Sequence, residues 1–281
     1  MNEITKRTIE DYKNYLVEEE KCSVTIEKYI RDITVFYEWL SGRELTKELA
    51  LEYKVQLMEN YAPTSINSIL ASLNSFFDHN GWHEIKLKNL KIQRRIFCQS
   101  EKELTKGEYE KLLQAAKDKK NERIYLVMQT ICATGIRVSE LSYITAEAVK
   151  CGQTQVKLKG KIRMIILNKD LCRVLKKYMQ EQGITQGCVF VTRNGKPLDR
   201  HGIWKAMKDL CESAGVSKEK VFPHALRHLF AKTYYSLQKD IVRLADILGH
   251  SSINTTRLYT IENGDEHRRQ MERMGLVCMR T

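Results

Sequence analysis

The spacing of apolar side chains predicts four helices in the first ninety residues. Pro63 suits the first turn of the last helix, the Asn80-Gly81 pair suits its end, and Ser23 is a candidate N-cap of the second. The connections between these helices are short, so their apolar stripes can meet in one core. We therefore expect a compact bundle, with helices over residues 8–20, 24–40 and 46–59 and a fourth from Pro63 to the Asn80-Gly81 pair.

A second region with helical periodicity opens at Thr105, a candidate N-cap. Residues 124–132 are almost entirely apolar and predict a buried helix. Further short elements are expected: helices over 171–179 and 203–211, and a strand or hairpin over 189–191 with its turn at Asn194-Gly195.

Residues 155–167 follow another pattern, because apolar and basic side chains alternate there with a period of two. This period is typical of strands, and Gly160 predicts a hairpin that turns there, with the glycine at the first central position of a two-residue loop. The expected fold class is therefore mainly α. An N-terminal four-helix bundle is followed by a mostly helical C-terminal domain with a small antiparallel β-sheet.

Two domains fit a chain of 281 residues of which 42% are apolar. We expect one domain at residues 1–90 and another at residues 104–281. Between them, residues 91–103 lose clear periodicity and gain basic side chains, which predicts a basic linker. The basic residues considered there are Lys91, Arg94 and Arg95. For any one of them, an ordinary solvated position is as good an explanation as a contact with the phosphate backbone.

The net charge of +12 favours a polyanionic partner such as nucleic acid. The charge is unevenly placed along the chain. Residues 1–90 hold 11 Lys and Arg against 15 Asp and Glu, whereas residues 91–281 hold 36 against 20. Most of the affinity for DNA should therefore come from the second part of the chain.

Eight cysteines are scattered without a C-x-x-C pair or any metal-ligand spacing, which argues against a secreted disulfide scaffold and against a metal site. No apolar run reaches about 18 residues, and no basic-then-apolar leader opens the sequence. We expect a cytoplasmic protein with no membrane span and no bound metal.

The candidate chemistry lies in four short segments that supply two arginines, two histidines and one tyrosine. The fork of an arginine matches the non-bridging oxygens of a phosphodiester with two parallel hydrogen bonds, so two arginines can replace a metal clamp. A histidine can accept the proton of a tyrosine hydroxyl, which then attacks the phosphorus. The segments are T-G-I-R ending at Arg137, H-A-L-R from His224 to Arg227, L-G-H ending at His250, and Tyr259.

In order and spacing these segments resemble the tyrosine recombinase, or phage integrase, family, and within it the Xer-type recombinases and the integrases of mobile elements. The resemblance covers essentially the whole chain and is most specific over residues 134–141, 224–228 and 248–260. It implies a site-specific recombinase that cuts and rejoins DNA through a 3′-phosphotyrosine intermediate, and so integrates, excises, resolves or inverts DNA. It also implies that no cofactor is needed and that the two domains clamp the duplex.

The same resemblance gives individual residues their roles. Arg137 and Arg227 would grip the scissile phosphate. His224 would act as acid or base, and His250 would stabilise the transition state. Tyr259 would form the 3′-phosphotyrosine and release a 5′-hydroxyl.

The family also uses a lysine on a β-hairpin as the general acid for the leaving 5′ oxygen. Many relatives read K-G-x-K-x-R, whereas this chain reads Lys159-Gly160-Lys161-Ile162-Arg163 and is one residue shorter. The alignment favours Lys159 as this acid. Lys161 is the alternative, and otherwise a candidate for DNA binding.

The expected partner is double-stranded DNA that carries a specific recombination site. In the first domain the candidates for groove contacts are Lys28, Arg31, Thr64 and Asn67. The resemblance implies a homotetramer in the DNA synapse, formed from a monomer or weak oligomer. Met271, Met274, Leu276 and Val277 are at roughly helical spacing, and a helix there could pack on its own domain or on a neighbouring protomer.

Two other functions share some of these features. A type IB topoisomerase relaxes DNA by similar tyrosine chemistry, and an accessory factor with the same fold would bind DNA without cutting it. The spacing of the segments and the N-terminal bundle favour recombination. The joining of two different DNA ends would discriminate between recombination and relaxation.

Overall fold

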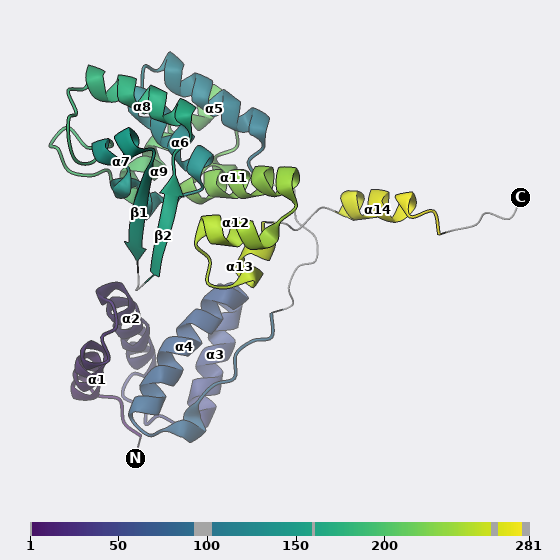
Figure 1. Cartoon of the computed structure of the whole chain (residues 1–281). Helices are drawn as coiled ribbons and strands as arrows, with labels where there is room; N and C mark the ends of the chain where they lie inside the picture. Colours follow the sequence, from purple (N-terminus) through teal and green to yellow (C-terminus); the bar gives the residue numbers. More distant parts are fainter. Residues whose placement is uncertain (1, 93–102, 159–160, 260–263, 277–281) are drawn as a thin grey trace, which may run out of the picture. The chain divides into compact units, whose positions relative to one another are not determined.

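A computed structural model of the chain describes residues 2–92, 103–158, 161–259 and 264–276. The chain divides into two compact units, Met1–Arg94 and Arg95–Thr281 (Figure 1). Each unit has an apolar core of its own.

The first unit is the four-helix bundle that the apolar periodicity predicts. Its second helix begins one residue earlier than expected: Cys22 is the N-cap and makes no capping side-chain hydrogen bond, whereas Ser23, the predicted cap, is the first helical residue. Asn80 does end the last helix, and Pro63 begins it. The helices are α1 (Lys6–Glu18), α2 (Ser23–Leu40), α3 (Lys47–Asn60) and α4 (Pro63–His79), followed by a 3-10 turn, η1 (His83–Ile85).

Aromatic rings fill the centre of this bundle. Tyr12, Phe36, Phe76 and Phe77 are fully buried, and the rings of Tyr12 and Phe76 meet edge to face at 5.2 Å. This geometry is the favoured one for aromatic pairs. The core therefore joins α1, α2 and α4 into one body.

Two asparagines of α4 hold the segment that follows η1. Asn74 accepts from Leu87 N and donates to Leu87 O, both at 2.8 Å. Asn67 makes the same pair of bonds with Leu90, at 2.8 and 3.0 Å. The two asparagines lie two helical turns apart on α4, so they fix the chain alongside that helix.

The second unit is mostly helical and contains one two-stranded antiparallel sheet, so the expected fold class is confirmed. Thr105 caps α5 through a capping box with Glu108, as predicted. None of the helices in the described ranges is long and apolar enough to cross a bilayer. The elements are α5 (Lys106–Asp118), α6 (Glu122–Thr134), η3 (Val138–Tyr143), α7 (Ala146–Cys151), β1 (Gln153–Leu158), β2 (Lys161–Ile166), α8 (Lys169–Glu181), α9 (Arg200–Lys208), α10 (Cys211–Ala214), η4 (Lys218–Lys220), α11 (Pro223–Gln238), α12 (Ile241–Leu248), α13 (Ile253–Arg257) and α14 (Gly264–Arg273).

Two expected elements of this unit differ in detail. The segment 203–211 was expected to be one helix, but α9 ends at Lys208 and α10 begins at Cys211. Residues 189–191 form no extended strand; Val191 pairs with Pro197 in an isolated bridge around the turn at Gly195.

The buried helix α6 lies at the centre of the unit. Val127, Met128 and Ile131 are completely buried, and α6 contacts α5, α8, α9 and α11. A helix that is apolar on nearly all sides needs such cover. Its end therefore has a fixed position, from which the chain enters the candidate site.

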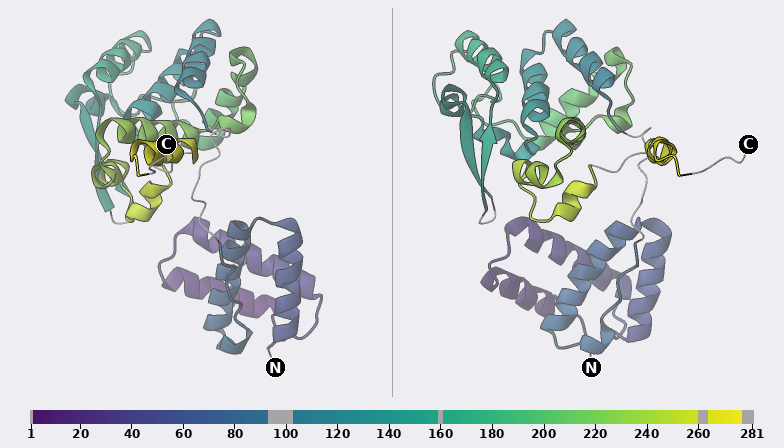
Figure 2. Two further views of the ribbon diagram at one scale, coloured as in Figure 1. Left: turned by 90° about the vertical axis from the view of Figure 1, so that its right-hand side faces the viewer. Right: turned by 45° about the vertical axis from the view of Figure 1, so that its right-hand side comes forward.

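The hairpin has its predicted place, and Leu158 of β1 pairs with Lys161 of β2. The expected turn position of Gly160 lies outside the described residues. β2 lies beside α12 (Figure 2). One face of the hairpin is buried and the other is open: Val156 and Ile165 are covered, whereas Ile162, Met164 and Ile166 are exposed.

Candidate active site

Arg137 is positioned by the end of α6. Gly135 caps the helix in the left-handed conformation, with φ of 65°, and a Cβ atom there would collide with the ring of Phe230. The turn is therefore one that only glycine fits. It brings Arg137 to the N-cap of η3, where Glu140 Oε2 accepts from Arg137 N at 2.7 Å and Oε1 pairs with Arg137 Nη1 at 3.0 Å. The Arg137 side chain is still 40% exposed.

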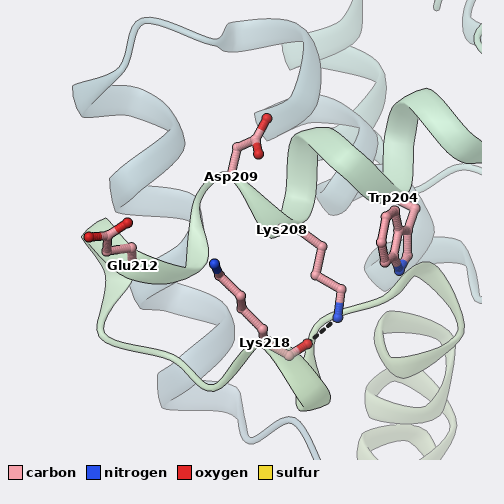
Figure 3. A pocket seen from close by; sticks show the side chains of 5 residues that line it. All are labelled: Trp204, Lys208, Asp209, Glu212 and Lys218. Carbon is pink, nitrogen blue, oxygen red and sulfur yellow. Dashed lines mark hydrogen bonds between the residues drawn. The ribbon is translucent and has the colours of Figure 1, made fainter.

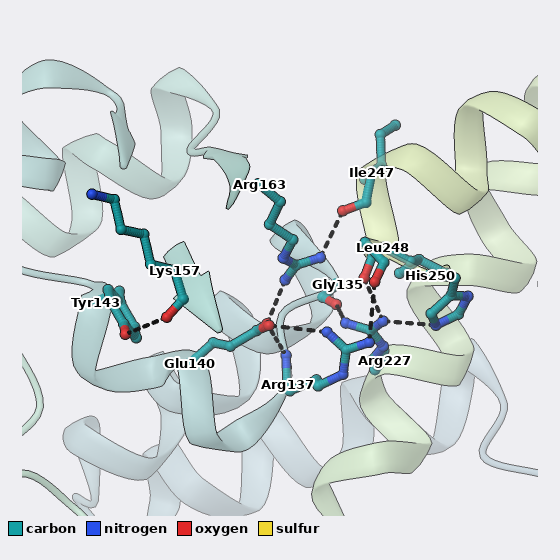
Figure 4. Close-up of polar contacts among 11 residues, drawn as sticks. Gly135, Arg137, Glu140, Tyr143, Lys157, Arg163, Arg227, Ile247, Leu248 and His250 are labelled. Atoms are coloured by element: carbon teal, nitrogen blue, oxygen red, sulfur yellow. Dashed lines mark hydrogen bonds and ion pairs between the residues drawn. The ribbon is translucent and has the colours of Figure 1, made fainter. Parts of the chain in front are cut away.

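Arg227 lies on α11 and is almost completely buried, with 1% of its surface exposed. Nη1 donates to Gly135 O at 2.6 Å, and Nη2 donates to Leu248 O at 2.7 Å and to His250 Nε2 at 2.9 Å (Figure 4). Burial, followed by the charge of Arg137, lowers the pKa of Arg227 to about 10. The guanidinium therefore keeps its charge at neutral pH.

His250 follows the left-handed Gly249 that ends α12. Because arginine has no acceptor, the bond from Arg227 requires an unprotonated Nε2. The ring proton then resides on Nδ1, which donates to Thr256 Oγ1 at 2.8 Å. Burial and then the charges of Arg227, Arg137 and Arg163 lower the pKa of His250 to about 4. His250 is therefore neutral, with a defined tautomer.

Tyr259 comes directly after α13 and is 5% exposed. Its hydroxyl lies 3.4 Å from His224 Nε2, and its ring stacks on His250 at 5.6 Å. Partial burial of the His224 ring, followed by the charge of Arg227, lowers the pKa of His224. The tyrosine hydroxyl thus has a neutral histidine beside it, at a distance somewhat long for a hydrogen bond.

The structure thus brings together five of the six residues expected to act in catalysis. They come from the turn after α6, from α11, from the end of α12 and from the segment after α13, which are separated by as many as 122 positions in the sequence. The five residues are Arg137, His224, Arg227, His250 and Tyr259. The sixth, Lys159, lies outside the described residues, as does the side chain of its alternative, Lys161.

Three further residues lie against this cluster. Glu140 both orients the Arg137 side chain and caps the start of η3. The ring of His228 meets Tyr259 edge-on at 5.0 Å, while its Nε2 lies 3.5 Å from Glu103. The sequence patterns did not single out Thr256, which is fully buried and accepts a hydrogen bond from His250 Nδ1.

Arg163 was also overlooked as a site residue. It lies on the buried face of the hairpin, donates from Nη1 to Ile247 O at 2.7 Å, and forms an ion pair with Glu140 through Nη2. The signal in the sequence was weak, because alternation in β2 separates two faces without telling which one is buried.

The candidates for DNA contacts in the first unit differ in how far their polar atoms are already bonded within the protein. Lys28 Nζ donates to Asp32, Ser68 O and Ser72, which occupies all three of its donors. Both polar atoms of the Asn67 side-chain amide bond to the backbone of Leu90. By contrast, the side chain of Arg31 is 70% exposed beside Asp32.

The remaining DNA candidates fall into two groups. Thr64, in the first turn of α4, and Lys91 are exposed. Arg94 and Arg95 lie outside the described residues.

A pocket elsewhere in the second unit offers no competing chemistry. It has a volume of about 500 Å³ and lies over α9, α10 and η4 (Figure 3). Lys208 crosses it to bond Lys218 O and also lies over the ring of Trp204 at 5.4 Å. Its acidic residues are Asp209 and Glu212, and it contains none of the five clustered residues.

Comparison with known families agrees with this arrangement. A family model described as "Phage integrase family" matches residues 102–266, and one described as "Phage integrase, N-terminal SAM-like domain" matches residues 9–82. The first match alone spans more than half of the chain.

Known proteins are similar over nearly the whole length. Tyrosine recombinase XerA of Pyrococcus furiosus is 30% identical, over 99% of this chain and 98% of that protein. Tyrosine recombinase XerD of Listeria monocytogenes is 32% identical, over 90% of this chain and 93% of that protein.

Solved structures share the fold at lower identity. A lambda integrase dimer bound to a COC' core site superposes with a TM-score of 0.75 at 18% identity, over 92% of this chain and 96% of that chain. XerH bound to its difH substrate superposes with a TM-score of 0.70 at 20% identity, over 95% and 84%. From the family model and the full-length relatives, the chain belongs to the phage integrase family and is a site-specific tyrosine recombinase.

Proposed function

We propose that this recombinase cuts DNA with Tyr259, in an active site that each protomer completes by itself. The observation that carries the proposal is the 3.4 Å between the Tyr259 hydroxyl and His224 Nε2, within one chain and beside Arg227 and His250. A nucleophile, its base and a phosphate-binding arginine are thus close together within one protomer.

The two arginines hold the scissile phosphate. Arg137 is accessible to an incoming backbone, while its carboxylate partner Glu140 limits the directions in which the fork can point. Arg227 supplies a buried positive charge, which acts more strongly because water is excluded around it. Together they stabilise the charge that develops on the non-bridging oxygens during attack.

Proton transfer accompanies both bond changes. His224 is neutral at physiological pH because its pKa is lowered, so it accepts the proton of Tyr259 as the tyrosine oxygen bonds to phosphorus. The bond from phosphorus to the 5′ oxygen breaks, and the hairpin lysine protonates that oxygen. We assign this proton to Lys159, with Lys161 as the alternative. The products are a 3′-phosphotyrosine and a 5′-hydroxyl, and reversal on another 5′-hydroxyl rejoins DNA.

His250 responds to the phosphate. In this structure its Nε2 accepts from Arg227. A bound phosphate adds negative charge nearby, which favours protonation of Nε2. The ring then donates to a phosphoryl oxygen and stabilises the transition state.

The DNA partner and the assembly are part of the same proposal. The two units clamp a duplex that contains a specific site, and four protomers form the synapse; the similar solved structures include an integrase dimer on a core site and XerH on difH. The domain limits proposed are 1–90 and 104–281, with a basic linker over 91–103. Because the substrate is DNA, a cytoplasmic location is also proposed.

Mixing two defective variants tests the self-contained active site. Tyr259→Phe lacks the nucleophile, and His224→Gln lacks the base. If each protomer uses its own tyrosine, a mixture cleaves no faster than the better of the two variants alone. Cleavage restored in the mixture would show that the tyrosine acts on a neighbour's site and would overturn this part of the proposal.

Recombination is distinguished from relaxation by its products. Two labelled duplexes of different length that carry the site should yield exchanged products with wild type. Relaxation of a supercoiled plasmid without exchange would favour the topoisomerase alternative. Binding with neither product would favour the accessory factor.

A further inference from the structure

Arg163 occupies an unusual place for an arginine. It lies in β2 on the same face as the buried Ile165, and its side chain is 10% exposed. Burying a guanidinium is costly, and Arg163 Nε is buried without a hydrogen-bond partner. An apolar side chain would suit this face better if stability were the whole requirement, as Val156 on β1 illustrates.

The two ends of the guanidinium reach two parts of the active site. Nη1 donates to Ile247 O at 2.7 Å, and Nη2 pairs with Glu140 (Figure 4). Glu140, which is 1% exposed, also binds the backbone and the side chain of Arg137. The Glu140 carboxylate therefore contacts both Arg163 and Arg137, the arginine proposed to bind the phosphate.

The other contact lies at the C-terminus of α12, immediately before His250. Its last carbonyls accept from three different arginines: Ile247 O from Arg163, Leu248 O from Arg227 at 2.7 Å, and Gly249 O from Arg137 at 3.5 Å. A helix C-terminus carries partial negative charge, which suits this cluster of cations. The three bonds fix the position from which His250 enters the site.

Gly249 shows how closely Arg163 packs there. Its φ is +63°, and a Cβ atom would lie 2.5 Å from Arg163 Cδ. The aliphatic part of Arg163 thus occupies the space that a side chain at position 249 would need. The L-G-H segment and the hairpin arginine are therefore sterically matched.

We propose that Arg163 is a positioning residue for strand cleavage: it ties the hairpin to the α12 terminus and, through Glu140, sets the direction of Arg137. It does not touch the phosphate, because its terminal nitrogens are directed at Glu140 and Ile247. The inference rests on the proposed roles of Arg137 and His250. It extends them to a residue that links three separate segments.

The charge of Arg163 gives the inference a second readout. His250 faces Arg227 and His224 from α11, Arg137 from the turn before η3, and Arg163 from β2, and it also contacts Thr256 and Tyr259. Loss of one of these cations should raise the pKa of His250. Because Arg163→Lys keeps the charge, a rise in Arg163→Met that is missing in Arg163→Lys reports the lost cation and not a loosened fold.

The test compares Arg163→Met and Arg163→Lys with the control Arg173→Met, which removes an arginine that is 79% exposed on α8. Single-turnover adduct formation is measured on the nicked duplex that wild type cleaves, alongside the Kd for that duplex. Arg163→Met should cleave about 100-fold more slowly at saturating DNA with nearly unchanged Kd, because a small misplacement of reacting groups has about that effect. Arg163→Lys should be intermediate, and Arg173→Met should match wild type.

Histidine NMR on the free, full-length variants supplies the second arm. The His250 pKa should be higher in Arg163→Met and near that of wild type in Arg163→Lys, which keeps the charge. Wild-type cleavage by a folded Arg163→Met would overturn the positioning role, and so would a His250 pKa that does not change. If wild type itself forms no adduct on DNA that it binds, the proposed function fails instead, and the NMR arm still decides whether Arg163 acts on His250.

Discussion

Arg227 donates from Nη2 to Nε2 of His250 at 2.9 Å, so the histidine is held in its neutral form by the arginine that is expected to share the phosphate with it. Thr256 accepts from the opposite nitrogen and fixes the tautomer. The site is therefore set up to accept a negative charge, since burial and the nearby charges of Arg227, Arg137 and Arg163 disfavour a further proton on that ring.

Stability should fall as the pH is lowered through the range in which unfolded His250 takes up a proton. The pKa of His250 is lowered from 6.5 to about 4 by folding, so between these values the unfolded state binds more protons than the folded state. The free energy of unfolding should decrease from pH 6.5 to pH 4, and His250→Gln should reduce the slope. Urea denaturation between pH 6.5 and pH 4 measures the free energy of unfolding. An unchanged slope against pH in His250→Gln would show that His250 does not contribute to this pH dependence.

Gly135 should tolerate a side chain far less than another glycine of the same conformation. Gly135 and Gly195 both have positive φ, of 65° and 73°, but only at Gly135 would a Cβ atom meet the ring of Phe230. Gly195→Ala should cost about 1–2 kcal/mol from backbone strain alone. Gly135→Ala should cost a further 1–3 kcal/mol, roughly, from overpacking. Equal losses in urea denaturation would mean that the contact is relieved at little cost.

In the first unit, substitution of Lys28 should affect stability, whereas substitution of Arg31 should affect DNA affinity. Lys28→Met removes three hydrogen bonds around the buried Asp32 and should lower the free energy of unfolding by about 1–3 kcal/mol. Arg31→Ala should change stability by less than about 0.5 kcal/mol. If Arg31 contacts a phosphate, its loss should weaken DNA binding and reduce the salt slope by about one. An Arg31→Ala variant that binds with wild-type affinity at every salt concentration would remove Arg31 from the interface.

The hairpin lysine can be identified by changing the leaving group. A substrate with sulfur at the bridging 5′ position releases a thiolate, which needs little protonation because thiol pKa values are about 8.5. Lys159→Ala should therefore be slow on the ordinary substrate and restored on the sulfur substrate, whereas Lys161→Ala should be near wild type on both. The reverse pattern would assign the proton to Lys161.

Local signals in the sequence account for much of the fold. Apolar spacing locates the bundle helices, and Thr105, Pro63 and Asn80 mark ends that the structure confirms. The errors occur where one residue decides the outcome. Serine is a better N-cap than cysteine, so the local signal favours Ser23. The helix α2 nevertheless begins one residue earlier, with Cys22 as its N-cap.

The active-site cluster could be anticipated only through the order of its motifs. Nothing within H-A-L-R or L-G-H indicates that Arg227 bonds both His250 and Gly135 O, because those contacts depend on how α11 packs on α6. The role of Arg163 could not be predicted from the sequence, for a related reason. The alternation in β2 allows either face to be buried, and tertiary packing against α12 buries the face that carries the arginine.

The most direct test of the account is covalent capture on nicked duplexes tiled from the DNA that flanks the protein's own gene, without added metal, with wild type and Tyr259→Phe. The variant should fold and bind as wild type does, because the substitution removes only the hydroxyl, which lies 3.4 Å from His224 Nε2, and leaves the buried ring in place. The account predicts a detergent-resistant adduct at one defined phosphate with wild type and none with Tyr259→Phe. An adduct that persists in Tyr259→Phe would contradict it, because the nucleophile would then be another residue.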